Sequence, residues 1–204
     1  MRMTKMRAAL VAAIAAVMII ALWFFTGMQD KASLVGGSLL LPTMAHAASL
    51  DPENTLYLET KYGRVVIALR PDLAPNHVKR IKELARARFY DGIVFHRVID
   101  GFMAQTGDPT GTGMGGSDLP DLKAEFSKES FTRGTLGMAR SSSPNSANSQ
   151  FFIMFADGPW LNGKYTIFGK VVSGMDAIDK IKRGEPVENP DKILALRVAA
   201  DVDK

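Results

Sequence analysis

Downstream of residue 54, short runs of β-branched and aromatic residues alternate with turn-forming residues, and this pattern limits the fold more than any other feature. In the stretch TLYLETKYGRVVIALR, two such runs flank Lys61-Tyr62-Gly63, which predicts a β-hairpin. Further strands are predicted at IVFHRVI, FMAQTG, GTLGMAR, SQFFIMF, KYTIFGKVV and KILALRVAADV.

Only two segments have helical periodicity. After Pro75, apolar residues recur on one face of a predicted helix, at Val78, Ile81, Leu84 and Ala85. The stretch GMDAIDKIKRG predicts a second, shorter helix that ends at Gly184. Many short strands with two helices favour a closed barrel or a sandwich over a parallel βαβ sheet.

The charge distribution argues against a nucleic-acid partner. The net charge is +4. Residues 1–47 hold Arg2, Lys5, Arg7 and Lys31 against Asp30, which leaves only +1 for residues 48–204. The basic residues of that larger part are scattered, whereas a nucleic-acid binder carries a clustered basic face.

The chain contains no cysteine, which excludes disulfides, thiolate metal sites and cysteine nucleophiles. Its three histidines, His46, His77 and His96, lie too far apart in the sequence to form a metal-binding motif. We therefore expect neither a metal nor a cofactor.

The first 47 residues are predicted to be a targeting or membrane-anchoring segment rather than part of the folded domain. The apolar run from Ala8 to Phe25 would span roughly 27 Å as a helix, close to the thickness of a bilayer core. Ala45-His46-Ala47 has the A-x-A pattern of a signal-peptidase site. Either cleavage after Ala47 or a retained inner-membrane anchor places the domain predicted at 54–202 in the periplasm.

Two long stretches rich in turn-forming residues interrupt the strands, at 107–122 and 139–150. Loops of this length in a compact domain are usually functional or mobile. Neither stretch has the glycine pattern of a dinucleotide-binding or P-loop. The serines of ARSSSPNSANSQ lack a GxSxG elbow, which makes a serine hydrolase an improbable interpretation.

The stretch FHRVIDGFMAQTGD places Arg97 and Gln105 among large apolar residues. Strands that only fill a core do not usually carry a guanidinium. Taken alone, Arg97 is more often a structural ion-pair partner, and Phe102 and Phe152 alternate with their neighbours as core residues do.

Three motifs, taken together, favour a functional site over these structural interpretations: FHRVIDGFMAQTGDPTGTGMGG, GTLGMARSSSPNSANSQFFIMF and PWLNGKYTIFGKVVSGMDAIDKI. In this order they closely resemble the cyclophilin family of peptidyl-prolyl cis–trans isomerases. The resemblance implies a mainly β fold, a closed eight-stranded antiparallel β-barrel capped by two α-helices, here preceded by an N-terminal hydrophobic helix.

The resemblance also implies the site residues. Arg97 takes the position of the catalytic arginine, with Gln105 orienting it or the substrate carbonyl. The implied substrate-binding residues are Phe102, Met103, Ala139, Arg140, Gln150, Phe152, Trp160, Leu161, Tyr165 and Phe168. Phe152 would form the floor of the proline pocket.

This chain departs from many family members at three positions. Tyr165 stands where many eukaryotic members have histidine, Arg140 where many have asparagine, and Asp100 where proline is common. Trp160 favours cyclosporin binding in the family, whereas Tyr165 and Arg140 argue against it.

The implied reaction is rotation about X-Pro bonds of exported, folding polypeptides, by a monomer and without a covalent intermediate. A guanidinium suits it, because a donor aimed at the proline nitrogen binds the twisted bond better than either planar isomer. The alternative is a chaperone or scaffold that binds proline-containing segments with little catalysis.

Overall fold

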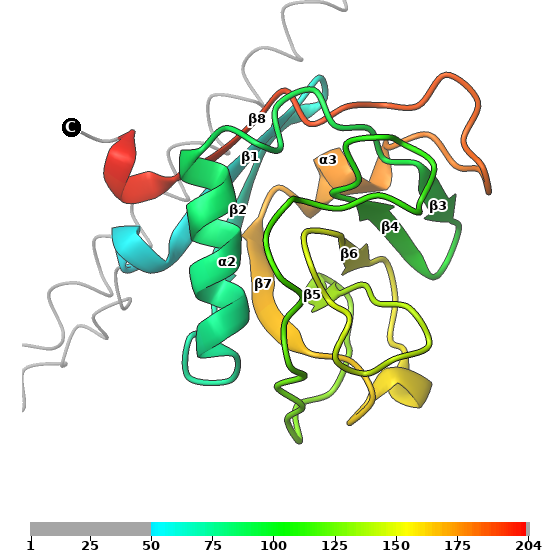
Figure 1. The fold of residues 1–204 in the computed structure, drawn as a ribbon. Coiled ribbons are helices and arrows are strands. Elements are labelled where there is room, and N and C mark those ends of the chain that lie inside the picture. Colours follow the sequence, from blue (N-terminus) through cyan, green and yellow to red (C-terminus); the bar gives the residue numbers. More distant parts are fainter. Residues whose placement is uncertain (1–49, 203–204) are drawn as a thin grey trace, which may run out of the picture. The chain divides into compact units, whose positions relative to one another are not determined.

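The computed structural model describes residues 50–202, in which one eight-stranded sheet carries the fold. Its strands are β1 (Thr55–Thr60), β2 (Gly63–Leu69), β3 (Arg97–Ile99), β4 (Met103–Thr106), β5 (Thr135–Met138), β6 (Phe151–Met154), β7 (Ile167–Ser173) and β8 (Ala195–Val198). Their order across the sheet is β3-β4-β6-β5-β7-β2-β1-β8, with antiparallel pairing throughout. Figure 1 shows the sheet as strongly curved.

The expectation of a closed barrel is wrong, because the edge strands β3 and β8 do not pair with each other. Val98, in the middle of β3, exchanges both backbone hydrogen bonds with Gly184 instead, each at 2.8 Å. The free edge of β3 is therefore already occupied. The segments before β3 and before β8 meet instead at the isolated bridge between Val94 and Lys192, where Phe95 N–H donates to Asp191 and Ile193 N–H donates to Ile93, each at 2.9 Å.

The predicted hairpin is confirmed, with β1 and β2 in register from Thr55 opposite Ala68 to Thr60 opposite Gly63. The hydroxyl of Thr60 donates to the carbonyl of Gly63 at 3.0 Å and so braces the tight turn between the strands. This hairpin links β7 to β8 and holds that half of the sheet together.

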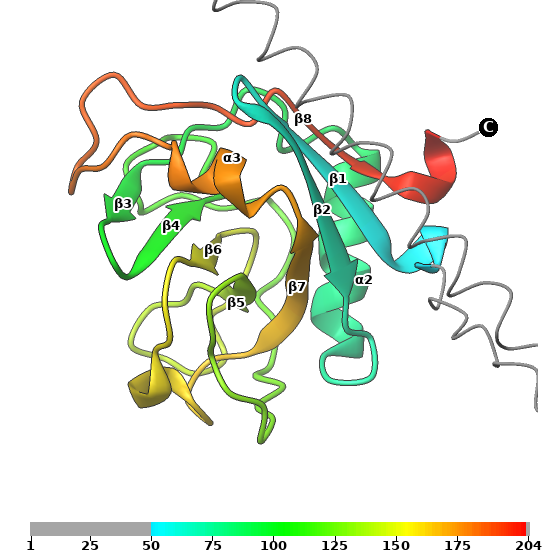
Figure 2. The ribbon, with the colours of Figure 1, turned by 180° about the vertical axis from the view of Figure 1, so that it is seen from behind.

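The first helix, α2 (Pro75–Arg86), has the expected buried face of Val78, Ile81, Leu84 and Ala85. The second helix, α3 (Met175–Asp179), is shorter than predicted. It begins after Gly174, whose φ is +83° and whose backbone lies so close to Arg64 that a Cβ would sit 2.2 Å from the Arg64 carbonyl oxygen. Both helices bury apolar residues in the same core, with α2 nearer the viewer in Figure 1 and α3 nearer the viewer in Figure 2.

Three short 3-10 turns complete the described regular structure: η1 (Pro52–Asn54), η2 (Pro159–Leu161) and η3 (Ala199–Asp201). Figure 1 shows η1 and η3 beside the same end of α2, so both ends of the described chain reach this side of the domain.

The predicted long loops lie between β4 and β5 and between β5 and β6. Within residues 50–202 no helix is long and apolar enough to cross a membrane. The whole predicted segment 1–47, with its hydrophobic helix and A-x-A site, lies outside the described residues.

Candidate active site

Two neighbouring rows of residues run across strands β3, β4, β6 and β5. The first row is Val98, Ala104, Ile153 and Leu136, all at most 1 % exposed and part of the barrel core. Residues next to each other along a strand point to opposite faces of a sheet. The adjacent row therefore faces away from the core; it is Arg97, Gln105, Phe152 and Gly137.

Gly137 makes room for the floor of a hollow on this outer face. A Cβ at Gly137 would lie 2.4 Å from Cζ of Phe152 and 2.6 Å from Cε1 of Phe131. Because Gly137 has no side chain, the ring of Phe152 lies over the strand and stacks on Phe131, with centroids 5.7 Å apart. The alternation of Phe152 with core residues is thus real, but Phe152 belongs to a second apolar cluster outside the barrel core.

The hollow has a volume of about 240 Å³. It is lined by Arg97, Phe102, Met103, Gln105, Ala139, Arg140, Phe152, Leu161 and Tyr165. These residues come from β3, β4 and β6, from the turn before β4, from the loop between β5 and β6, from η2 and from the segment before β7. Most of the expected site residues are therefore brought together around one small cavity with a mainly apolar floor and charged groups at its rim.

Arg97 lies at the rim with a side chain 37 % exposed. Its Nε donates to the carboxylate of Glu185, and its Nη1 lies 3.5 Å from Oε1 of Gln105. Its Nη2 has no hydrogen-bond partner among residues 50–202. The guanidinium thus keeps donors available for a molecule in the hollow.

Gln105 is held in turn by Gln150. The Nε2 of Gln105 donates to Oε1 of Gln150 at 2.9 Å, and the Nε2 of Gln150 donates to the carbonyls of Gly113 (3.0 Å) and Gly115 (2.8 Å). This chain fixes the amide orientation, so that Oε1 of Gln105 faces Arg97. Gln150 itself lines a neighbouring hollow of about 560 Å³ rather than the first one.

Tyr165 and Arg140 form the opposite wall. The Tyr165 ring meets Phe152 edge-on, with centroids 5.9 Å apart at 82°. The Arg140 guanidinium lies 4.4 Å from the Tyr165 centroid and donates to the carbonyl of Lys164 through Nη2 at 3.0 Å. Tyr165 therefore gives the hollow an aromatic wall.

Asp108 fixes the loop that supports Gln150. It accepts hydrogen bonds from the N–H groups of Thr110 (2.8 Å) and Gly113 (2.6 Å) and from the Thr110 hydroxyl (2.8 Å). Burial alone would raise the pKa of Asp108, but these donors and the N–H of Gly115 outweigh it and lower the pKa to about 2. The aspartate is therefore ionised near neutral pH.

Besides Gln150, two expected site residues do not line the hollow. Phe168 is fully buried in the barrel core and meets Phe151 edge-on at 5.9 Å, because its position on β7 points inward. Trp160 is 57 % exposed and lies beside the hollow, with its ring 5.8 Å from that of Phe102.

Sequence reasoning missed Glu185, which contacts Arg97 from a loop far along the chain. Only the backbone pairing of Gly184 with Val98 places Glu185 beside Arg97, and no local sequence pattern predicts that pairing. Among the described residues, no three side chains of the metal-binding types are grouped to hold an ion.

Comparisons with known proteins agree on one family. The family model described as cyclophilin type peptidyl-prolyl cis-trans isomerase/CLD matches residues 55–198. A curated relative from Brucella suis biovar 1, a "probable peptidyl-prolyl cis-trans isomerase", is 57 % identical over 180 residues, covering 80 % of this chain and 92 % of that protein. A relative from Schizosaccharomyces pombe, also a peptidyl-prolyl cis-trans isomerase, is 43 % identical over 128 residues, 61 % of this chain and 82 % of its own.

Solved structures give the same result. Cyclophilin AquaCyp293 from Hirschia baltica has a TM-score of 0.68 and 30 % identity, covering 74 % of this chain and 76 % of its own. A Cryptosporidium parvum cyclophilin solved in the presence of the dipeptide Ala-Pro has a TM-score of 0.66 and 31 % identity, covering 71 % and 98 %.

The fold therefore places a rim arginine over an apolar hollow on the outer face of a curved sheet. With the family match over most of the described residues, this chain belongs to the cyclophilin-type peptidyl-prolyl cis–trans isomerases.

Proposed function

We propose that this chain catalyses rotation about X-Pro bonds with Arg97 as the catalytic residue and the 240 Å³ hollow as the proline site. The supporting observation is the position of Arg97 at the rim of that hollow, with its Nη2 unpaired among residues 50–202. A further support is the Ala-Pro dipeptide present with the related Cryptosporidium parvum structure.

The chemistry follows from the peptide bond. Conjugation between nitrogen and carbonyl gives a rotation barrier of about 18–20 kcal/mol. In the twisted transition state the conjugation is lost and the nitrogen lone pair becomes localised. A donor aimed at this nitrogen stabilises the twisted state more than either planar isomer, and only such a difference accelerates rotation.

The residues that line the hollow have different roles in this reaction. Phe102, Met103, Phe152 and Leu161 bury the pyrrolidine ring by apolar contact. Arg97 supplies the donor from the rim of the hollow. Gln105 restricts where the Arg97 Nη1 lies. Each tenfold acceleration needs about 1.4 kcal/mol of differential stabilisation, and one charged hydrogen bond contributes about 1.5–3 kcal/mol.

We further propose that the enzyme acts on exported polypeptides as they fold in the periplasm. The apolar run 8–25 and the A-x-A sequence at 45–47 support this location. The choice between a cleaved leader and an inner-membrane anchor, the monomeric state and cyclosporin binding stay predictions from the sequence and its resemblance.

The test is an isomerase assay on an X-Pro tetrapeptide with the full chain purified in a mild detergent. We expect Arg97→Ala to lower kcat/KM by roughly one to two orders of magnitude, the size of one charged hydrogen bond, while peptide binding by calorimetry persists. The matched control is Arg88→Ala, which removes an arginine that lines a different hollow.

Two outcomes would contradict the proposal. If the native chain binds the peptide but leaves its relaxation at the uncatalysed rate, the protein is a proline-segment binder or scaffold. If the Arg97→Ala variant relaxes the peptide as fast as the native chain, Arg97 is not the catalytic residue.

A further inference from the structure

A loop segment runs along the outer edge of β3 and continues the sheet by one short stretch. Gly184 and Val98 exchange two backbone hydrogen bonds of 2.8 Å, and the N–H of Val187 donates to the carbonyl of His96 at 3.2 Å. Arg97 lies between His96 and Val98, just as Glu185 lies between Gly184 and Val187. The backbone pairing therefore sets Glu185 beside Arg97.

This segment is fixed on both sides of Glu185. Before it, the Arg183 guanidinium lies 4.1 Å from the Phe155 centroid, and its Nε donates to Oδ1 of Asp100 at 3.0 Å. After it, Val187 is only 8 % exposed and packs into the barrel core. The carboxylate of Glu185 is thus delivered by an anchored backbone rather than by a free loop.

Glu185 extends the outward-facing row of the active site by one position. The row becomes Glu185, Arg97, Gln105, Phe152 and Gly137, and neighbouring side chains in such a row interact. Glu185 accepts from Nε of Arg97, the nitrogen on the stem side of the guanidinium. Gln105 lies near Nη1, which leaves Nη2 without a partner within residues 50–202.

Holding Nε has a specific geometric effect. The guanidinium is planar and rigid, so a partner at Nε sets the plane in which both terminal nitrogens lie. An exposed arginine side chain otherwise samples many rotamers, and ordering it has an entropic cost in the transition state. The pair has side chains 37 % and 55 % exposed, so it contributes little to global stability.

We propose that Glu185 is a positioning residue for Arg97: it orients the guanidinium so that its terminal donors face the proline site. This inference rests on the proposed function, because it assigns Glu185 a role only through Arg97. Glu185 does not line the hollow and is given no contact with the substrate.

The test is a double-mutant cycle in the full chain with the X-Pro tetrapeptide assay. We expect Glu185→Ala to lower kcat about tenfold with KM changed less than about twofold, because the apolar lining of the hollow is untouched. Glu185→Gln keeps an acceptor oxygen and should recover part of the lost kcat. In the Arg97→Ala background, Glu185→Ala should have no further effect.

Glu188→Ala is the matched control. It lies in the same loop, and its carboxylate has no partner among the described residues, so kcat should stay at the native value. Thermal unfolding of all variants separates a positioning role from loss of the loop structure, since Glu185→Gln should melt at the native temperature.

The possible outcomes separate the two proposals. If Arg97→Ala is slow but Glu185→Ala has native or higher kcat, the positioning role is overturned and the proposed function stands. The positioning role is also overturned if the two substitutions lower kcat multiplicatively in the double variant. If Arg97→Ala itself has native activity, the proposed function fails first.

Discussion

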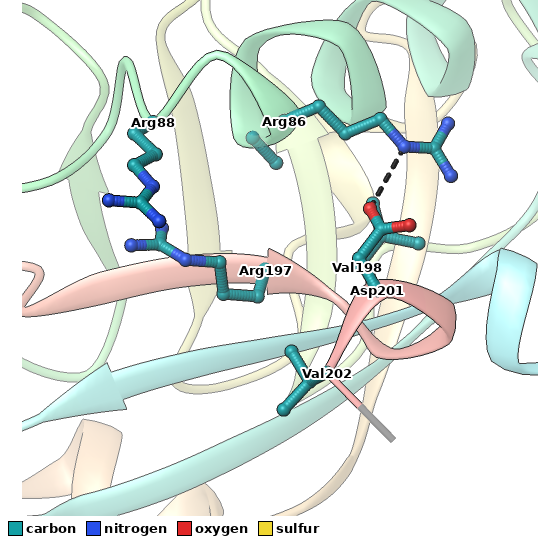
Figure 3. A pocket seen from close by; sticks show the side chains of 7 residues that line it. Arg86, Arg88, Arg197, Val198, Asp201 and Val202 are labelled. Atoms are coloured by element: carbon teal, nitrogen blue, oxygen red, sulfur yellow. Dashed lines mark hydrogen bonds and ion pairs between the residues drawn. The ribbon is translucent and has the colours of Figure 1, made fainter. Parts of the chain in front are cut away.

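Two hollows on this domain are both bordered by arginine, yet only one resembles an active site. The second hollow, of about 430 Å³, lies between the end of α2 and the end of β8. Figure 3 shows its arginines, Arg86, Arg88 and Arg197, with Arg86 joined to Asp201. More guanidinium groups border this hollow than the proline site, so charge alone does not distinguish the two.

One difference lies in the paired arginines and in which of their donors are occupied. Arg197 donates Nη1 and Nη2 to the two carboxylate oxygens of Asp91, at 2.7 and 2.6 Å. Arg86 donates Nε to Asp201 at 3.0 Å and Nη2 to Glu53 at 2.7 Å. At Arg97 the carboxylate takes Nε only. Arg197 and Arg86 thus use at least one terminal nitrogen to tie elements together, whereas Arg97 keeps Nη2 without a partner among residues 50–202.

The floors differ as well. The C-terminal hollow offers only the small apolar residues Ala85, Val198 and Val202. The proline site has the stacked ring of Phe152, with Met103 and Leu161 around it. A ring-shaped apolar guest gains contact area only in the second case. Because Arg88 also has no hydrogen-bond partner among residues 50–202, a free donor borders both hollows, and the aromatic floor makes the difference between them.

The largest effect is expected at the floor. Phe152 is 5 % exposed and stacks on Phe131, so Phe152→Ala leaves a cavity and should lower the free energy of unfolding by about 3–5 kcal/mol. Peptide affinity should fall with it. Urea unfolding and calorimetry measure both quantities. A stable variant that still binds the peptide would show that the floor does not distinguish the two hollows.

The next largest effect is expected on the stability of the protein at acid pH. The pKa of Asp108 lies at about 2 in the fold, below its ordinary value of 3.8, so the carboxylate stabilises the protein above pH 4 and this contribution is lost as the pH falls towards 2. The difference corresponds to on the order of 2 kcal/mol. Urea unfolding at several pH values should show Asp108→Asn to be less stable at pH 7 and less sensitive to acid. An equally steep acid dependence in the variant would place the titrating group elsewhere.

The smallest effect is expected at the C-terminal hollow. Asp91→Asn weakens the bond to Arg197 and should lower the free energy of unfolding by about 1 kcal/mol, with native kcat. Arg88→Gln, which removes a lining side chain without a hydrogen-bond partner among residues 50–202, is the control and should change stability by less than about 0.5 kcal/mol. A loss of isomerase activity in Asp91→Asn would break the distinction between a structural and a catalytic arginine.

Local patterns in the sequence predicted much of this molecule. The hairpin around Lys61 and Tyr62 and the buried face of α2 follow from alternation and helical period, which act between near neighbours. Arg97 and Gln105 also fall within one hairpin, paired across β3 and β4. The motif resemblance then located most of the residues that line the hollow.

The missed features depend on contacts between distant segments. Phe168 carries the same kind of side chain as Phe152, but register on β7 turns it into the core. The barrel is open because Gly184 takes the edge of β3 that closure would need. The same pairing brings Glu185 to Arg97.

The sequence by itself therefore determined the strands, the main helix and the place of Arg97 on β3, because side-chain alternation and turn chemistry are local properties. Only the tertiary structure decided which donors of Arg97 stay free. Which donors stay free depends on the carboxylate of Glu185, 88 residues away in the chain. Backbone pairing sets the position of Glu185, and the local sequence pattern does not predict this pairing.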